Sequence, residues 1–327
     1  MASVASKQPE IQTLFSKIIK NKQLQHAYIF EGVAGSGKLE MAKWLAQSIH
    51  CQHRLPDGSP CLSCNQCVRI EHEEHPDVTI IEPEGLSIKV NQVRAIKDEF
   101  SKSGMESRRK ILIIEDMDKI TTSAANSLLK FIEEPEGEIT ILLLTTEVQQ
   151  LLPTIVSRCQ LIHFPVRNIH ERVEEITAKD IPRQTATLLA NLTQDAAEAQ
   201  EIYEKENFGA LVKTIWEWFK LLNKRDDQAL IYIQTNLMEQ VDNREASARL
   251  LDLLILLYQD LITIYFEQDR VLAFSKYEKE LDQMITPTIG YKLPQFLSIV
   301  LEGKKKLNRY VAAQGVFEQI ALRIIDL

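Results

Sequence analysis

A glycine-rich segment at residues 32–38 constrains the fold more strongly than any other part of the sequence. The segment is GVAGSGK; it follows the short β-like run Ala27–Phe30 and opens a helical pattern over Lys38–His50. In such a loop the backbone N–H groups and the helix N-terminus surround a phosphate, while the lysine offsets its charge. The same letters also occur in tight turns without function, and the order of strand, loop and helix favours a phosphate loop. The candidate phosphate-binding residues are Gly32, Gly35, Ser36, Gly37 and Lys38.

Four further apolar runs predict the rest of a sheet. They lie at Val78–Ile81, Ile111–Ile114, Ile139–Leu144 and Leu161–Phe164. Continuous apolar runs are typical of strands that are buried on both faces. Strands that alternate with helices imply a mainly parallel sheet covered on both sides. We therefore predict an α/β P-loop domain over residues 1–166.

Two helices of this domain carry recognisable end signals. Asn91 is a candidate cap for a helix that Gly104 would end. Thr121 or Thr122 is a candidate cap for a second helix, which must end near Pro135. The side chains of these caps can accept a hydrogen bond from the first helical turn, which is why such residues mark helix starts.

The strand signals stop at about Pro165, and the rest of the sequence is helical in pattern. Short patterns occupy residues 169–203, and longer ones occupy residues 208–327. Apolar residues at helical spacing mark one of the longer helices: Leu250, Leu254, Leu257, Leu261 and Ile264. We predict a small helical domain at residues 167–206 and a larger helical domain at residues 207–327.

Composition narrows the classes of function. Among 327 residues, 38 are Lys or Arg and 46 are Asp or Glu, and the net charge of -8 argues against a basic coat for DNA. The most lysine-dense stretch, Lys304–Lys306, is predicted to form a solvated turn. Residues 1–12 lack the apolar core of a signal peptide, and the longest apolar run, Leu253–Tyr258, is far below the ~20 residues that cross a bilayer. We expect a cytoplasmic protein without membrane contact.

Four of the five cysteines form a cluster with the spacing C-x9-C-x2-C-x2-C. Four thiolates can close a tetrahedral Zn²⁺ site, and a closed site is structural because it leaves no open position for a substrate. Reduced cysteines are expected in the cytoplasm, so the cluster favours metal over disulfides. His50, His53 and His72 lie nearby as substitute ligands, whereas Cys159 lies outside the cluster as a small core residue. The predicted zinc knuckle spans residues 51–67, with the ligands Cys51, Cys61, Cys64 and Cys67.

Two positions depart from what a working P-loop ATPase needs. Leu39 stands where a Ser or Thr hydroxyl would ligate Mg²⁺, and leucine offers no oxygen. After the run Ile111–Ile114 the order is Glu115-Asp116, whereas Asp followed by Glu would hold the metal and the attacking water. A misplacement of ~1 Å can lower a rate on the order of 10²-fold. The pattern favours a degenerate ATPase; the alternative is that Glu115, Asp116 and Asp118 form only a polar strand end.

The sequence resembles the AAA+ subunits of bacterial replicative clamp loaders over about residues 24–160. The supporting segments are Leu24–Tyr28, the phosphate loop, the four cysteines, His75–Asp77, Ala124–Pro135 and Ser157–Cys159. The last two segments are highly specific to the family. The helical remainder fits the family's lid and collar domains in length and type. The resemblance implies an AAA+ P-loop domain followed by a helical lid domain and a helical collar domain that mediates oligomerisation.

The resemblance also implies roles and partners. In this family gamma/tau subunits hydrolyse ATP, delta opens the sliding clamp, and a nearly rigid further subunit lies beside a gamma/tau site. Leu39 and Glu115-Asp116 resemble that rigid subunit in low-GC Gram-positive bacteria. Arg158 matches the arginine that reaches the γ-phosphate on the adjacent subunit, and Thr145 occupies the sensor position. The expected partners are gamma/tau, delta, the sliding clamp and primed DNA, within the DNA polymerase III holoenzyme.

Alternatives remain open at this point. The first is an active ATPase of the gamma/tau type, and the second is a zinc-dependent nucleic-acid-binding module with a relic phosphate loop, although the acidic net charge weighs against it. Arg158 could instead be an ordinary surface or salt-bridged arginine. Asn126, Ser127 and Lys130 lie either on a solvated helix face or near DNA. Whether the loop retains ATP or ADP is not decided by these residues.

Overall fold

In the part of the chain that the structure describes, the predicted strands form one five-stranded sheet. Its order is β2-β3-β4-β1-β5, and every neighbouring pair is parallel. The strands are β1 (Ala27–Glu31), β2 (Val78–Ile81), β3 (Arg109–Ile114), β4 (Glu138–Thr145) and β5 (Gln160–His163). The parallel sheet is therefore confirmed. The last strand ends at His163, one residue before its predicted end; Pro165, which has no N–H to donate to a strand ladder, follows Phe164.

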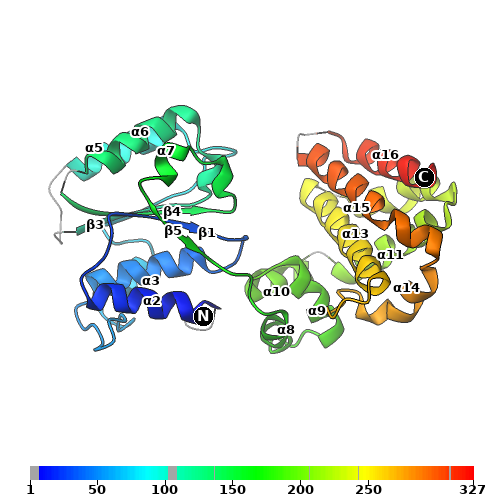
Figure 1. Ribbon diagram of the computed structural model, residues 1–327, viewed down its shortest axis with the longest axis horizontal. Helices are drawn as coiled ribbons and strands as arrows, with labels where there is room; N and C mark the ends of the chain where they lie inside the picture. The colour runs from blue at the N-terminus through cyan, green and yellow to red at the C-terminus, as the bar shows by residue number, and fades with distance from the viewer. Residues whose placement is uncertain (1–6, 102–108, 136, 206, 242, 309–310) are drawn as a thin grey trace. The chain divides into compact units, whose positions relative to one another are not determined.

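The computed structural model describes residues 7–101, 109–135, 137–205, 207–241, 243–308 and 311–327. The chain divides into two compact units, Met1–Arg167 and Asn168–Leu327. The first unit contains the sheet and the second consists of helices (Figure 1). No helix in the described part of the chain is long and apolar enough to span a membrane.

Helices cover both faces of the sheet in the first unit, as Figure 1 shows. Alternate residues of each strand enter opposite cores: Ile29 faces one core, whereas Tyr28 and Phe30 face the other. One core is closed by α5 (Val90–Ser101), α6 (Thr122–Glu133) and α7 (Pro153–Val156). The other core is closed by α2 (Pro9–Lys20), α3 (Lys38–His50) and α4 (Asn65–Glu71).

The observed helix bounds agree with some of the predicted caps and ends and differ from others. Helix α3 has the predicted bounds, and Thr121 caps α6 by accepting a hydrogen bond from the N–H of Ala124. The prediction for Asn91 is wrong, because α5 begins at Val90 and already contains it. Gly104, its predicted end, lies outside the described residues. Helix α2 had no sequence prediction, yet it buries one apolar face in the core: Ile11, Phe15 and Ile19.

The second unit contains the short and the long helices that the pattern predicts. They are α8 (Ile169–Thr177), α9 (Arg183–Leu192), α10 (Ala196–Lys205), α11 (Phe208–Lys224), α12 (Gln228–Tyr232), α13 (Arg244–Tyr265), α14 (Glu278–Met284), α15 (Pro287–Asn308) and α16 (Ala313–Ile325). One continuous apolar core runs through them. The predicted boundary between residues 206 and 207 stays a prediction.

The lysine-dense stretch corrects a prediction. Lys304–Lys306 lies inside α15 rather than in a turn. The helix continues there because lysine is a good helix former and Leu307, just beyond the run, is buried in the core of the second unit. Lys304 also pairs with Asp252 of α13. A short lysine run can therefore continue a helix whose next turn is anchored in the core.

Because all strands are parallel, they end on one side of the sheet, the carboxyl edge, and begin on the other side, the amino edge. The phosphate loop and Glu115 follow strands, and Thr145 is the last residue of β4, so all three lie at the carboxyl edge. Arg158 precedes β5 and lies at the amino edge, together with Cys51 at the end of α3. The candidate nucleotide site therefore lies at the carboxyl edge, and the candidate arginine finger and zinc site lie at the amino edge.

Candidate functional site

The phosphate loop is built on glycines that no other residue could replace without strain. Gly35 and Gly37 have φ of 71° and 93°, in the region that favours glycine. At Gly32 an added Cβ would lie 2.8 Å from the Phe164 Cβ and 2.9 Å from the Ser36 Oγ. Gly37 caps α3 in this left-handed conformation, so the first N–H groups of the helix open toward the loop. The local backbone has the glycine conformations that the predicted phosphate loop requires.

The lysine of the loop is bound to the loop itself. The Lys38 Nζ donates to the carbonyl of Gly32 at 2.6 Å and to that of Val33 at 2.8 Å. Burial lowers the pKa of Lys38, while the nearby carboxylates of Asp116 and Asp118 act in the opposite direction. The next side chain, Leu39, is half-buried and packs against the core. It contributes no oxygen to the site.

The chain segment before α2 closes the loop from outside. Gln8 is 4% exposed, and its Nε2 donates to the carbonyls of Ser36 at 2.9 Å and of Pro165 at 3.0 Å. Lys7 forms an ion pair with Glu40 at 2.6 Å. Nothing in the sequence marks these two residues, because they precede every motif and contact the loop only through the fold.

The acidic end of β3 holds one partly buried and one half-exposed carboxyl. Burial, together with the neighbouring carboxylates of Glu82 and Asp116, raises the pKa of Glu115 to about 7. The Glu115 Oε1 is buried and has no hydrogen-bond partner among the described residues. Asp116 has φ of 46° and pairs with the Lys119 Nζ at 2.7 Å. Glu115 therefore resists ionisation, and Asp116 is already paired with the ammonium group of Lys119.

The hydroxyl at the sensor position is also occupied. Thr145, at the end of β4, is buried, and its Oγ1 donates to the Asp118 Oδ1 at 2.9 Å. The same Oδ1 accepts from the N–H of Thr146 at 3.1 Å, and Thr145 accepts from the N–H of Glu147 at 3.1 Å. Asp118, which the sequence suggested only as part of a polar strand end, holds the hydroxyl by this network.

Arg158 lies in the turn between α7 and β5, with its side chain 41% exposed. Its Nη1 donates to the carbonyl of Thr154 at 3.0 Å and to the Ser157 Oγ at 3.3 Å. Its Nη2 lies 2.7 Å from the Glu133 Oε1 at the end of α6. The following residue, Cys159, is half-buried against the core, as predicted. Burial raises the pKa of its thiol to about 12.

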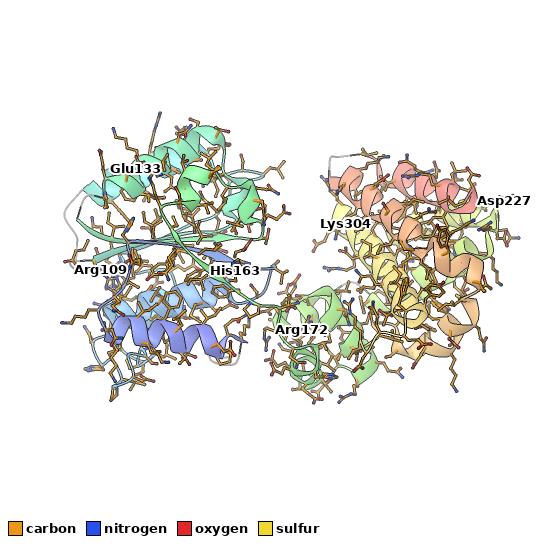
Figure 2. All side chains as sticks on the ribbon, viewed as in Figure 1. Arg109, Glu133, His163, Arg172, Asp227 and Lys304 are labelled. Atoms are coloured by element: carbon orange, nitrogen blue, oxygen red, sulfur yellow. The ribbon has the colours of Figure 1, made fainter. Side chains whose placement is uncertain are left out.

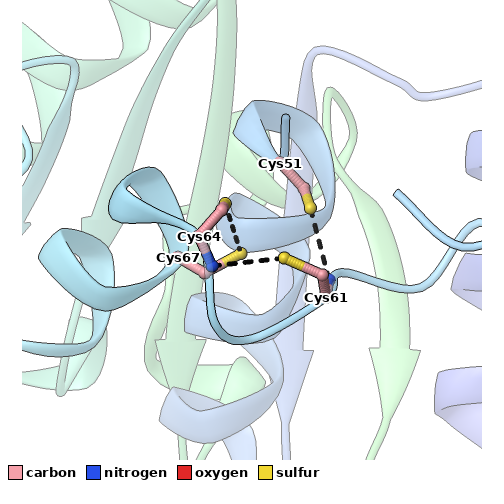
Figure 3. Close-up of side chains that lie close together, drawn as sticks. All are labelled: Cys51, Cys61, Cys64 and Cys67. Atoms are coloured by element: carbon pink, nitrogen blue, oxygen red, sulfur yellow. Dashed lines mark hydrogen bonds between the residues drawn. The ribbon is translucent and has the colours of Figure 1, made fainter. Parts of the chain in front are cut away.

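The four clustered cysteines converge on one point (Figure 3). Their sulfur atoms all lie within 4.8 Å of one another. The backbone N–H of Cys61 donates to the Cys51 Sγ at 3.2 Å, and that of Cys64 donates to the Cys61 Sγ at 3.3 Å. Burial raises the pKa of the Cys67 thiol, since a thiolate would lose its hydration there. A divalent cation among the sulfurs would offset that cost.

Two elements frame the cysteine cluster. Cys51 ends α3 and Cys64 begins α4, so rigid helices hold sulfurs on both sides. The loop between them turns back at Gly58, where an added Cβ would lie 2.8 Å from the Ser16 carbonyl oxygen of α2. Among the described residues, the potential ligand cluster contains these cysteines and no histidine. His50 instead stacks on His75, with ring centroids 4.6 Å apart.

Comparison with known proteins places these features in a family. A family model described as DNA polymerase III, delta subunit, matches residues 7–168. DNA polymerase III subunit delta' of Bacillus subtilis is 36% identical over 318 residues, which is 97% of this chain and 96% of that protein. The chain belongs to the DNA polymerase III delta' family.

Other relatives share less with the chain. DNA polymerase III subunit tau of Bacillus subtilis is 32% identical over 157 residues, 48% of this chain and 28% of that protein. A crystal structure of a DNA polymerase III gamma subunit-related protein from Thermotoga maritima is 18% identical, covers 98% of this chain and 99% of that chain, and has a TM-score of 0.48. The likeness to the delta' protein thus extends over both units, whereas the likeness to the tau protein covers about half of the chain.

Proposed function

We propose that this chain is the delta' subunit of a replicative clamp loader and helps to load the sliding clamp onto primed DNA. It assembles with gamma/tau and delta subunits, hydrolyses no ATP itself, and supplies Arg158 to the ATP site of a neighbouring gamma/tau subunit. The family membership supports the assembly, because relatives named delta' and gamma/tau are subunits of DNA polymerase III.

One observation carries the role of Arg158: it lies at the opposite edge of the sheet from its own phosphate loop. Strand β5 spans Gln160–His163, and His163 is in register with Glu31, the residue before the loop. Each strand residue advances about 3.3 Å, so the backbone of Arg158 starts more than about 15 Å from that end of the sheet. An exposed guanidinium at this edge can therefore reach a phosphate only on another subunit.

The contacts of the chain's own site support the proposed lack of ATP hydrolysis. Hydrolysis needs a metal ligand after the lysine, a carboxylate that orients water and polar groups that respond to the γ-phosphate. Leu39 offers no ligand, burial raises the pKa of Glu115 to about 7, and the Thr145 hydroxyl is bound to Asp118. The loop could still bind phosphate through its backbone, so bound ADP or ATP without turnover is compatible with the proposal.

We further propose that Cys51, Cys61, Cys64 and Cys67 hold a structural Zn²⁺. Four sulfurs at mutual distances below 4.8 Å suit a tetrahedral ion with Zn–S bonds of about 2.3 Å. The ion would join the end of α3 to α4 and would leave no position for a substrate. Its role is therefore to hold the knuckle, not to catalyse.

The decisive experiment measures ATP hydrolysis by the chain alone and by the assembled complex with Arg158→Ala. The isolated chain should show no multiple-turnover hydrolysis. An arginine delivered in trans raises the rate of hydrolysis roughly 10³–10⁵-fold. The neighbouring site should therefore lose nearly all turnover, while the other sites of the complex continue to hydrolyse ATP. Clamp loading should fall in parallel, with folding and assembly unchanged. Arg183→Ala, which removes another exposed, ion-paired arginine, is the matched control.

The two remaining alternatives predict other results. Hydrolysis by the isolated chain that Lys38→Ala abolishes would identify an active gamma/tau-like ATPase. Salt-sensitive DNA binding by the isolated chain that is lost with the knuckle would identify a zinc-dependent nucleic-acid-binding module. Unchanged clamp loading with Arg158→Ala would show that the arginine finger lies elsewhere.

A further inference from the structure

The guanidinium of Arg158 already has an anionic partner within its own chain. The Nη2 lies 2.7 Å from the Glu133 Oε1, and the Nη1 is held by the Thr154 carbonyl and the Ser157 Oγ. Figure 2 labels Glu133 on the helical layer that also contains α5 and α7. The contact joins residues that are distant in sequence and close in the fold. No sequence motif relates these two residues as a pair.

The place of Glu133 explains why an arginine binds it. Glu133 is the last residue of α6, which ends before Pro135. The carboxyl end of a helix carries partial negative charge, so a glutamate there is unfavourable and a nearby cation is favourable. The side chains of Ile132 and Ile155 belong to one buried core, which fixes α6 beside α7 and thus Glu133 beside Arg158.

We infer that Glu133 is a positioning residue that holds Arg158 in the free subunit and competes with the neighbour's triphosphate for it. The inference rests on the proposed function of Arg158. A carboxylate and a γ-phosphate are both anions that pair with a guanidinium fork. While Glu133 binds the Nη2, the positive charge offered to a neighbouring phosphate is largely neutralised. Docking of the ATP-loaded neighbour draws the guanidinium away from Glu133.

Exposure makes this exchange small in energy and therefore reversible. The side chains of Arg158 and Glu133 are 41% and 40% exposed, so water screens their attraction. Exposed ion pairs change an equilibrium by about 1.4- to 5-fold. A buried pair would oppose release much more strongly, because separation would leave an unpaired charge away from water. The pair can thus orient Arg158 without preventing its transfer.

The test uses the assembled complex and Glu133→Gln, which keeps the shape of the side chain and removes its charge. The measured quantity is the Arg158-dependent ATPase rate: the rate of each complex minus that of the complex with Arg158→Ala. At ATP concentrations below KM, with clamp and primed DNA present, Glu133→Gln should raise this rate by about 1.4- to 5-fold. Glu134→Gln, at the adjacent exposed glutamate, is the matched control and should change nothing.

Three results separate the possible failures. A gain that disappears in the Glu133→Gln, Arg158→Ala double variant supports the inference, since a purely structural role of Glu133 could not increase activity. An Arg158-dependent rate that is unchanged or lower in Glu133→Gln overturns the inference and leaves the proposed function standing. If Arg158→Ala itself has no effect on the complex, the proposed function fails and this inference fails with it.

Discussion

The two edges of the sheet in the first unit hold different functional groups. At the carboxyl edge, Lys38 is bound to its own loop, Asp116 to Lys119, and Thr145 to Asp118. At the amino edge, Arg158 is paired with Glu133, and four cysteine sulfurs converge beyond the end of α3. In a working P-loop ATPase, catalytic chemistry takes place at the carboxyl edge.

Under the proposed function, this difference would let a subunit keep a nucleotide-binding fold without turnover of its own. The phosphate loop still positions α3, and α3 in turn carries Cys51 at its far end. The polar groups of the carboxyl edge have partners within the chain, whereas Arg158 would act on a neighbouring subunit. The predictions below test how far the two edges are independent.

The largest expected effect concerns the metal. Native protein should contain one Zn²⁺, because structural zinc sites of this kind bind with about 10–16 kcal/mol. Cys64→Ser should remove stoichiometric zinc and increase hydrogen exchange in α4 and the preceding loop, while the sheet stays folded. Elemental analysis and hydrogen–deuterium exchange measure the two effects. Cys159→Ser, at the cysteine outside the cluster, is the control and should retain zinc. Native protein without stoichiometric zinc would contradict the prediction.

A smaller effect should appear at the carboxyl edge as pH dependence. Burial raises the pKa of Glu115 to about 7 from an ordinary 4.5, so the folded chain retains a proton that the unfolded chain releases. The resulting loss of stability develops between pH 4.5 and 7 and is complete above pH 7. Glu115→Gln removes this loss. It should stabilise the chain at pH 8 by on the order of 1–2 kcal/mol, since water partly screens the half-exposed carboxyl.

Urea unfolding of wild type and Glu115→Gln at pH 5 and pH 8 checks this sign. The gain in unfolding free energy should be much smaller at pH 5, where most of the penalty has not developed. Glu134→Gln, whose carboxylate stays in water, should show no such difference between the two pH values. An equal gain at both pH values would mean that packing, and not ionisation, separates the variants.

Sequence reasoning reached most of the sheet because its strands are continuous apolar runs. It placed β2 and the bounds of α3 correctly, since their periodicity and flanking turns are local signals. It located the four cysteines because metal ligands have a recognisable spacing. It also named Leu39 and Glu115 as departures, because a motif defines what those positions should contain.

Contacts between distant segments were not predictable in the same way. Gln8 reaches Pro165, and Glu133 reaches Arg158, only after the sheet has brought their elements together. A lysine run alone predicts a turn at Lys304, because its partner, Asp252, lies on another helix. The apolar spacing of Ile11, Phe15 and Ile19 is a local signal for α2, and no motif precedes it. Local patterns gave the elements, and the pairs between elements required the fold.

The smallest expected effect comes from restoring one ligand to the closed edge. Leu39→Thr adds the hydroxyl that a P-loop uses to bind Mg²⁺. It should tighten Mg²⁺-dependent binding of a fluorescent ATP analogue by about tenfold or less, on the scale of a hydrogen bond to a charged group, which contributes about 1.5 kcal/mol. It should not create hydrolysis, because the order Glu115-Asp116 leaves the carboxylates misplaced and Thr145 stays bound to Asp118.

The matched control for this change is Leu39→Val, which has the same shape as threonine and no hydroxyl. Both variants lose packing of the half-buried Leu39 against the core, so both should be destabilised by about 1 kcal/mol. Only Leu39→Thr should bind nucleotide more tightly with Mg²⁺ than with EDTA. Turnover by Leu39→Thr would show that one missing ligand alone had closed the carboxyl edge. The order Glu115-Asp116 and the bond of Thr145 to Asp118 would then be compatible with catalysis, and the difference between the two edges would depend on residue 39 alone.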